Sequence, residues 1–279
     1  MRCPPRVLCM MDLAGAGRCS LAVVLPVLAA CGVQGCPLPP VLLPAHTGGF
    51  AEVPRKDIGA YARQAAAFYQ KEQITFEAVY IGYLAGAAQF DLAEELLAQY
   101  PAAYKLVDPV LGDSGRLYQS FTPDMVLRMR ALCGQADLIT PNLTESALLL
   151  GEDPLPLPPA PDVVQQRLQT LAANGQAVLL TGIPLPENKV QVAGRMPQGP
   201  PFTLQHRLFP ENYPGTGDLF AAAVLGLLLR GLPLWHAAAQ AADFLESAIE
   251  ATHTAGAEVR HGVWFEPFLP QLSRAADRA

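Results

Sequence analysis

Two glycines and an aspartate stand directly before a long apolar run, in Tyr213-Pro214-Gly215-Thr216-Gly217-Asp218 followed by Leu219–Leu229. The glycines allow a turn whose N–H groups face inward, and the apolar run predicts a helix whose dipole adds positive potential at the same point. This combination predicts an anion site at a helix N-terminus. Asp218 either caps the helix or accepts a proton from a hydroxyl group that attacks a phosphoryl group, and these residues alone leave both interpretations open.

Length and charge indicate one domain with a small ligand. A chain of 279 residues is long enough for a large α/β domain, so residues 1–279 are expected to form a single domain. The net charge is −6, only 16% of the residues are charged, and the sequence has no Lys/Arg block. These features argue against nucleic acid or an anionic membrane as the main partner.

Six cysteines without C-x-x-C spacing predict free thiols in a cytoplasmic protein, with neither disulfides nor a cysteine metal site. Near the N-terminus, the apolar run 21–30 and Leu28-Ala29-Ala30-Cys31 resemble a lipoprotein signal with its cleavage box. That run is too short to span a bilayer, and an ordinary strand–helix unit explains the same residues. We therefore expect a cytoplasmic protein, with lipidation of Cys31 as the alternative.

Short β-rich runs alternate with helical patterns along the whole chain, which is typical of a mostly parallel sheet covered on both faces. The sequence therefore predicts an α/β fold, a three-layer α/β/α sandwich. Strands are expected at 6–11, 41–43, 76–81, 105–108, 137–140, 177–181, 190–194 and 202–208. Helices are expected at 20–31, 57–71, 142–150, 163–172, 220–229 and 235–251. Two further helices are expected, one that ends at 97 and another that begins at 122. Residues 12–19 are expected to form a loop.

Polar or glycine-rich segments follow nearly every expected strand. In a parallel sheet these segments meet at the carboxyl edge, where ligands bind. Asp108, Asp113 and Glu145 are acidic residues of this edge, and their oxygen atoms suit Mg²⁺ bound to nucleotide phosphates. Each also has a structural alternative: Asp108 as a cap of the loop through Pro109, Asp113 in an Asx-turn, and Glu145 in a capping box with Asn142.

Several common catalytic motifs are absent from the sequence. It contains no G-x-x-x-x-G-K-[ST] phosphate loop, and Gly15-Ala16-Gly17 lacks the third glycine of a dinucleotide-binding turn. Neither a G-x-S-x-G elbow nor a catalytic cysteine signature occurs. His46 has no neighbouring His or Glu at metal-ligand spacing, so it is expected to form hydrogen bonds in its loop.

The glycine turn resembles the second signature of the ribokinase-like sugar and vitamin kinases. Further segments resemble the pyridoxal kinase branch, in the family's order and over nearly the whole chain: Ala45-His46-Thr47-Gly48, Gly82-Tyr83-Leu84, 108–118 and 139–145. The resemblance implies ATP-dependent phosphorylation of the 5'-hydroxymethyl group of pyridoxal, pyridoxine or pyridoxamine, in the salvage of pyridoxal 5'-phosphate. It also implies ATP and Mg²⁺ as cofactors, K⁺ as a candidate monovalent cation, and a homodimer.

The resemblance assigns a role to each matching residue. The catalytic base is implied to be Asp218, and the anion hole Gly215, Thr216 and Gly217. The Mg²⁺ carboxylates, acting partly through water, are implied to be Asp113 and Glu145. Residues along the nucleotide are expected to be Asp108, Thr140, Asn142, Thr181 and Thr216, and those around the vitamer ring Asp12, His46, Thr47 and Tyr83.

One departure from the family concerns the substrate. Most pyridoxal kinases carry a Ser-His pair after the first strand, where this chain has Asp12-Leu13. Asp12 either contacts the ring's 3-hydroxyl or nitrogen and favours pyridoxamine by charge attraction, or it caps a loop. Two other functions stay open: a hydroxymethylpyrimidine kinase of thiamine synthesis, which has a similar fold and glycine turn, and a catalytically idle family member that binds a vitamer or nucleotide. The intact Asp218 and anion-hole residues argue against idleness.

Overall fold

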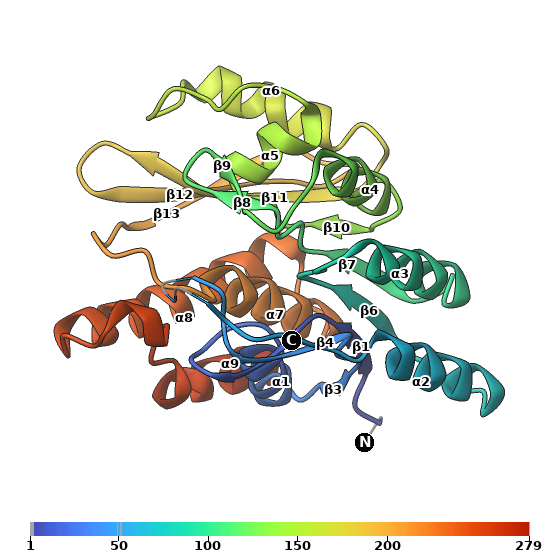
Figure 1. Cartoon of the computed structure of the whole chain (residues 1–279). Coiled ribbons are helices and arrows are strands. Elements are labelled where there is room, and N and C mark those ends of the chain that lie inside the picture. The colour runs from blue at the N-terminus through green and yellow to red at the C-terminus, as the bar shows by residue number, and fades with distance from the viewer. Residues whose placement is uncertain (1–2, 49, 51, 279) are drawn as a thin grey trace.

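The computed structural model describes residues 3–48, 50 and 52–278. Its main sheet has eight strands in the order β13-β12-β11-β10-β7-β6-β1-β3 (Figure 1). Neighbours from β11 to β3 are parallel, whereas β12 and β13 are antiparallel additions at one edge. The strands span Arg6–Met10 (β1), Gln34–Pro37 (β3), Ala78–Ile81 (β6), Tyr104–Val107 (β7), Leu138–Ile139 (β10), Ala177–Leu185 (β11), Lys189–Arg195 (β12) and Phe202–Arg207 (β13). The predicted, mostly parallel α/β sheet is confirmed.

Helices cover both faces of this sheet and complete the predicted three layers. One face packs against α1 (Leu21–Ala30), α7 (Thr216–Leu229), α8 (Leu234–Thr254) and α9 (Leu269–Ala276). The other face packs against α2 (Gly59–Lys71), α3 (Ala87–Gln99), α4 (Pro123–Cys133), α5 (Leu143–Leu150) and α6 (Pro161–Leu171). The period of two in a strand produces this division, because Val7 and Cys9 of β1 enter the first core while Leu8 and Met10 enter the second.

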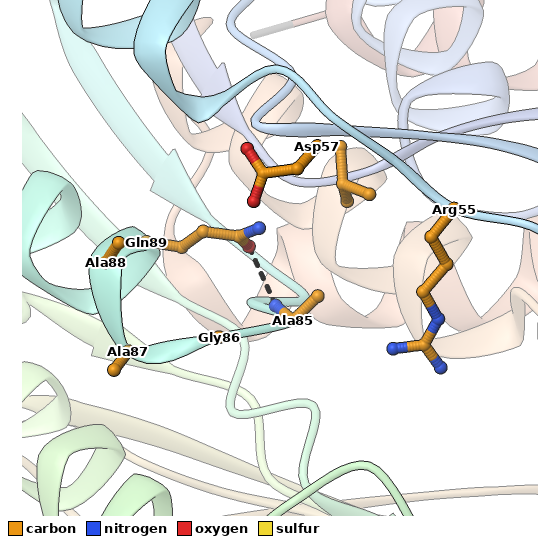
Figure 2. Close-up of a pocket in the computed structure, with 8 residues that line it drawn as sticks. Arg55, Asp57, Ala85, Gly86, Ala87, Ala88 and Gln89 are labelled. Carbon is orange, nitrogen blue, oxygen red and sulfur yellow. Dashed lines mark hydrogen bonds between the residues drawn. The ribbon is translucent and has the colours of Figure 1, made fainter.

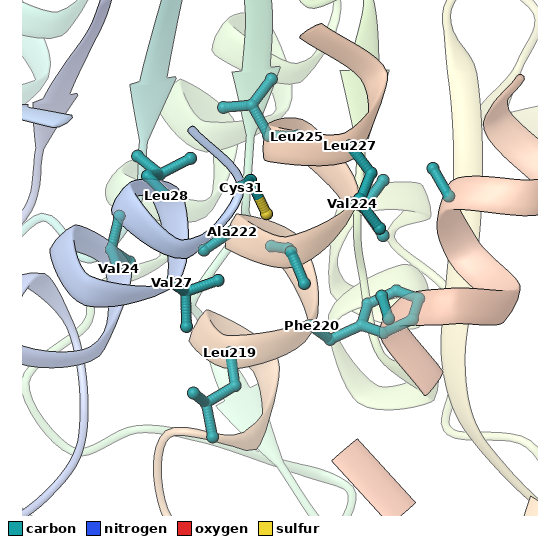
Figure 3. Packing of buried hydrophobic residues seen from close by; sticks show 14 of the residues in the cluster. Val24, Val27, Leu28, Cys31, Leu219, Phe220, Ala222, Val224, Leu225 and Leu227 are labelled. Atoms are coloured by element: carbon teal, nitrogen blue, oxygen red, sulfur yellow. The ribbon is translucent and has the colours of Figure 1, made fainter. Parts of the chain in front are cut away.

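Helices α1 and α7 pack closely at the centre of the first core (Figure 3). A Cβ added at Gly226 would lie 2.7 Å from Cys31 Cβ, so glycine is required for this approach. Cys31 is 1% exposed, and processing at Cys31 would remove β1, which lies between β3 and β6 in the main sheet. Among the described residues, no helix is long and apolar enough to cross a membrane.

Several short strands lie where the sequence predicted loops. Residues 12–19 contain β2 (Leu13–Ala16), which forms a small second sheet with β4 (Val41–Ala45) and β5 (Lys56–Asp57). The segment 108–118 contains a hairpin of β8 (Gly112–Asp113) and β9 (Arg116–Leu117). Strand β11 was also predicted too short, because it continues to Leu185 after an irregularity between Leu180 and Ile183. These pieces are too short for an alternating pattern to show in the sequence.

The predicted helix starts at 122 and 142 are confirmed, whereas the helix expected at 57–71 begins at Gly59 because Asp57 belongs to β5. Thr122 caps α4, with Pro123 at the first helical position. Asn142 and Glu145 form both hydrogen bonds of a capping box at α5, and Gly151 ends that helix in the left-handed conformation. These signals are local, so the sequence alone was sufficient to place them.

Candidate active site

The glycine turn lies at the carboxyl edge of the main sheet, where α7 begins. Gly215 precedes the helix with φ 80°, and Thr216 is its first residue. A Cβ at Gly215 would overlap Arg18 O, so the loop before α1 packs directly on this turn. Asp218 therefore lies inside the first turn of α7, and its interpretation as the helix cap is wrong.

The Asp218 carboxylate is held from outside its own helix. Ser20 N donates a hydrogen bond to Asp218 Oδ2 at 2.8 Å, and Asp218 accepts no other hydrogen bond from the described residues. Burial, with a smaller effect from the negative charge of Asp108, raises the pKa of Asp218 to about 8. A carboxyl group with a pKa near neutrality and one unpaired oxygen is suited to act as a general base.

Asp108 follows β7 and faces the same turn. Thr140 Oγ1 donates to Asp108 Oδ1 at 2.8 Å, and a Cβ added at Gly217 would lie 4.0 Å from Asp108 Oδ2. Burial raises the pKa of Asp108 to about 6, although the Thr140 hydrogen bond opposes the shift. The buried hydroxyl of Tyr80 lies beside this carboxylate, and burial and the charge of Asp108 raise the pKa of Tyr80 well above its usual range.

Asp113 belongs to β8, and Glu145, in the first turn of α5, contacts the residue before that strand. Glu145 is 5% exposed and accepts from Asn142 N at 2.8 Å and Leu111 N at 3.3 Å. Burial and the nearby Asp108 charge raise the pKa of Glu145 well above its usual range. Asp113 accepts from Ser114 N at 2.7 Å and from Asn212 Nδ2 at 2.6 Å. The capping box of Glu145 is thus realised. The Asx-turn of Asp113 is not, because Asp113 accepts from Ser114 N, while Gly115 N donates to Thr144 Oγ1 at 2.8 Å.

The charges of this edge fit a bound cation. Asp108, Glu145 and Asp218 accept no hydrogen bond from a lysine or arginine in residues 3–48, 50 and 52–278. Within the same ranges, no group of three His, Cys, Asp or Glu side chains could hold a metal by itself. Mg²⁺ usually needs only one or two carboxylates, with water and phosphate oxygens completing its shell, so Asp113 and Glu145 fit that ion.

The other expected nucleotide residues lie close to this group. Asn142 Nδ2 donates to Gly112 O at 3.0 Å, and Asn142 forms an isolated parallel bridge with Thr181. Thr181 Oγ1 donates to Pro141 O at 3.4 Å. Thr216 Oγ1 donates to Tyr213 O at 3.3 Å, which helps to fix the glycine turn.

The expected substrate residues divide into two pairs. Asp12 is 3% exposed and accepts from Ser20 Oγ at 2.5 Å, and burial raises its pKa. His46 is buried, with Nε2 2.6 Å from Arg260 O and Nδ1 accepting from Gly48 N at 3.2 Å. These partners define the neutral ring with its proton on Nε2, so both ring nitrogens of His46 are already engaged by backbone groups.

Thr47 and Tyr83 are less tightly fixed. Thr47 is exposed, and Tyr83 O–H pairs with Ser120 Oγ at 3.3 Å while its ring packs edge-on against Phe121. Neither side chain contacts Asp218 or Asp12 through a hydrogen bond in the described chain.

A cavity of about 350 Å³ lies between β4, β5 and the start of α3 (Figure 2). Arg55 and Asp57 line one side, and residues 85–89 line the other. The positive charge of Arg55 also acts on Asp12, so the cavity lies on the side of that expected substrate residue.

Three elements of the site were not predicted from the sequence. Ser20 touches both Asp12 and Asp218, and Asn212 holds Asp113. The short helix η1 (Val259–His261) supplies the carbonyl of Arg260 to His46. Of these four contacts, the three other than Ser20–Asp12 join residues that are far apart in sequence, where no local pattern signals them.

The order of the main sheet, its helical layers and the glycine turn before α7 define a ribokinase-like fold. The chain belongs to the phosphomethylpyrimidine kinase family, whose profile matches residues 24–263. A pyridoxine/pyridoxal/pyridoxamine kinase from Bordetella pertussis is 29% identical over 260 residues, which is 86% of this chain and 87% of that protein.

Two crystal structures have nearly the same fold over the full length. A candidate phosphomethylpyrimidine kinase from Bacteroides thetaiotaomicron, solved with pyridoxal, is 33% identical with a TM-score of 0.91, and the match covers 96% of both chains. Pyridoxal kinase from Lactobacillus plantarum is 33% identical with a TM-score of 0.90, and the match covers 98% of both chains.

Proposed function

We propose that this protein transfers the γ-phosphoryl group of ATP to the 5'-hydroxymethyl group of a B6 vitamer. The observation that carries the proposal is the Asp218 carboxylate in the first turn of α7, with one oxygen fixed by Ser20 N–H and the other unpaired among the described residues. The glycine turn places N–H groups beside that carboxylate. A base and an anion site at one point are what a phosphoryl transfer to a hydroxyl group requires.

The reaction assigns one step to each group. The vitamer hydroxyl oxygen attacks the γ-phosphorus, the bond from that phosphorus to the bridging oxygen breaks, and its electron pair leaves with ADP. Asp218 Oδ1 accepts the hydroxyl proton. The N–H groups at Gly215, Thr216 and Gly217, with the dipole of α7, stabilise negative charge on the transferring group.

Asp113 and Glu145 would hold Mg²⁺ against the nucleotide phosphates, and the ion would neutralise phosphate charge when bound. Asp108, Thr140, Asn142 and Thr181 lie along the same sheet edge and would contact the phosphates. The raised pKa of Glu145 supports this assignment, because burial and the nearby charge of Asp108 both disfavour its charged form, and a bound cation would favour that form.

The comparisons favour a B6 vitamer over a pyrimidine as the acceptor. The B. pertussis relative is named for three B6 vitamers, and the B. thetaiotaomicron structure contains pyridoxal although that protein is described as a phosphomethylpyrimidine kinase. The family description itself names the pyrimidine substrate, so hydroxymethylpyrimidine is the alternative acceptor to test.

The test is a phosphorylation assay with ATP, Mg²⁺ and, in parallel, added K⁺. Pyridoxal, pyridoxine, pyridoxamine and hydroxymethylpyrimidine are compared at equal concentrations, with product detected by mass spectrometry. We expect a phosphorylated vitamer at the highest kcat/KM. A preference for hydroxymethylpyrimidine would replace the proposal, and binding without turnover of any compound would indicate an idle family member.

The remaining features of the proposal concern the protein as a whole. We propose one domain, a homodimer and a cytoplasmic location, with no nucleic-acid partner. Exposed Leu13 and Leu42 on paired strands of the small sheet support a second copy at that face. Light scattering coupled to size-exclusion chromatography tests the dimer, and a monomer at micromolar concentration would contradict it.

A further inference from the structure

Ser20 contacts two carboxylates at once. Its backbone N–H donates to Asp218 Oδ2 at 2.8 Å, and its hydroxyl donates to Asp12 Oδ1 at 2.5 Å. Ser20 itself is 6% exposed and Asp12 is 3% exposed, so both contacts are shielded from water. The two carboxylates are thus connected through one residue that stands at the start of α1.

The backbone of Ser20 is strained. Its φ is 51° and its ψ is −139°, a conformation that glycine adopts readily and other residues rarely do. Such strain persists only where surrounding contacts enforce it, and it concentrates at functional sites. The hydroxyl bond to Asp12 is a contact of this kind, because it fixes the residue whose N–H is turned toward Asp218.

Two neighbouring turns pack closely against the residues just before Ser20. A Cβ added at Gly215 would lie 3.0 Å from Cys19 Cα, and one added at Gly262 would lie 2.8 Å from Arg18 O. Both glycines have positive φ, at 80° and 73°. The segment Arg18–Ser20 is therefore enclosed by the anion-hole turn on one side and the C-terminal segment on the other.

We propose that Asp12 and Ser20 form a positioning pair for the catalytic base, in which Ser20 N–H occupies Asp218 Oδ2 and leaves Oδ1 to take the substrate proton. This assignment rests on the proposed function for its catalytic meaning. Asp12 acts through Ser20. In this assignment Asp12 does not recognise the charge of the vitamer.

The decisive variants change the hydroxyl and the strain separately. Ser20→Ala removes the bond to Asp12 and keeps a side chain that disfavours the strained backbone, so the N–H moves away from Asp218. We expect kcat to fall by about 10- to 100-fold, as displacements of roughly 1 Å do, with vitamer KM nearly unchanged. Ser20→Gly also loses the hydroxyl but accepts the backbone without strain, so its kcat should fall less.

The pH profile separates positioning from general damage. Ser20 N–H stabilises the charged form of Asp218, and its loss raises the pKa of that group. The acid limb of kcat should therefore move to higher pH in Ser20→Ala. Ser273→Ala is the matched control, because it removes a hydroxyl that donates to Ala30 O at the other end of α1, and it should leave kcat and the limb unchanged.

Asp12 variants distinguish the pair from substrate recognition. Asp12→Asn keeps an oxygen that accepts from Ser20 Oγ, whereas Asp12→Ala does not, so the alanine variant should lose more kcat. Equal losses in the two variants, together with a changed pyridoxamine-to-pyridoxal ratio, would overturn the pair in favour of charge reading. Wild-type kcat and pH profile in Ser20→Ala would also overturn it.

A readout without turnover keeps this test independent of the substrate. In the wild type, the Ser20 amide proton resonance should move with the titration of Asp218, and Asp218→Asn should abolish the movement. If no vitamer is phosphorylated but this titration is seen, the proposed function fails and the contact stands. If the resonance does not titrate, the pair is refuted whatever the substrate is.

Discussion

Replacing Gly215 with alanine should destabilise the protein through two separable effects. The residue has φ 80°, a region that disfavours alanine by about 1–2 kcal/mol. The new Cβ would also overlap Arg18 O and lie 3.0 Å from Cys19 Cα, and forced overpacking of this kind costs about 1–3 kcal/mol. The expected loss in the free energy of unfolding is therefore about 2–5 kcal/mol.

A control isolates the steric part. Gly256 has φ 62° and nothing within 4 Å of an added Cβ, so Gly256→Ala should cost only the backbone component, about 1–2 kcal/mol. Urea unfolding of both variants gives the difference directly. Gly215→Ala should also lower kcat, because the clash displaces the N–H donors of the turn, and complete loss of one such donor costs about 10²–10³-fold. If Gly215→Ala is no less stable than Gly256→Ala, the close approach of the Arg18 loop to the anion hole is wrong.

Three further predictions concern the catalytic groups. Asp218→Asn should lower kcat by about 10²–10⁴-fold and still bind substrate by calorimetry. The kcat of the wild type should rise with pH through about 8, because the base must be deprotonated. An unchanged kcat in Asp218→Asn would assign Asp218 a structural role only. Asp113→Ala and Glu145→Ala should each raise the Mg²⁺ concentration at half-maximal rate. Glu145→Ala should also lose about 0.5–2 kcal/mol of stability, because its capping box is removed. Mg²⁺ titrations that match the wild type in both variants would leave these two residues only their structural roles. His46→Ala should raise vitamer KM more than Arg260→Ala, since the acceptor for His46 is the backbone oxygen of Arg260; equal KM values in the two variants would contradict that contact.

The strands and helix caps that the sequence predicts correctly are those whose signal is local. Buried strands such as β6 and the caps at Thr122 and Asn142 depend on residues within a few positions of each other. The same reasoning placed Asp108, Glu145 and Asp218 at one edge of the sheet, because parallel strands share their carboxyl edge. The structure agrees, since the charge of Asp108 acts on both Glu145 and Asp218.

The sequence could not supply the contacts that hold those groups. Ser20 lies 198 positions from Asp218, and His46 lies 214 positions from Arg260, so their pairing depends on the finished fold. The small sheet was missed for the same reason, because β5 is two residues long and exists only through its partner β4. For Asp12 the consequence is functional, because its hydrogen bond from Ser20 is the basis for the proposal that it positions the base.

The buried carboxylates also link folding to ligand supply. In the unfolded chain Asp108 and Asp218 lose their protons near pH 4, whereas in the folded protein their pKa values are about 6 and about 8. Their contribution to stability is thus fully present below about pH 4 and is lost as the pH rises through those folded values. At neutral pH the folded protein carries the cost of these buried charges, and the proposed magnesium nucleotide would offset that cost by binding only the folded state. The free energy of unfolding should therefore increase with the concentration of the protein's own ligands.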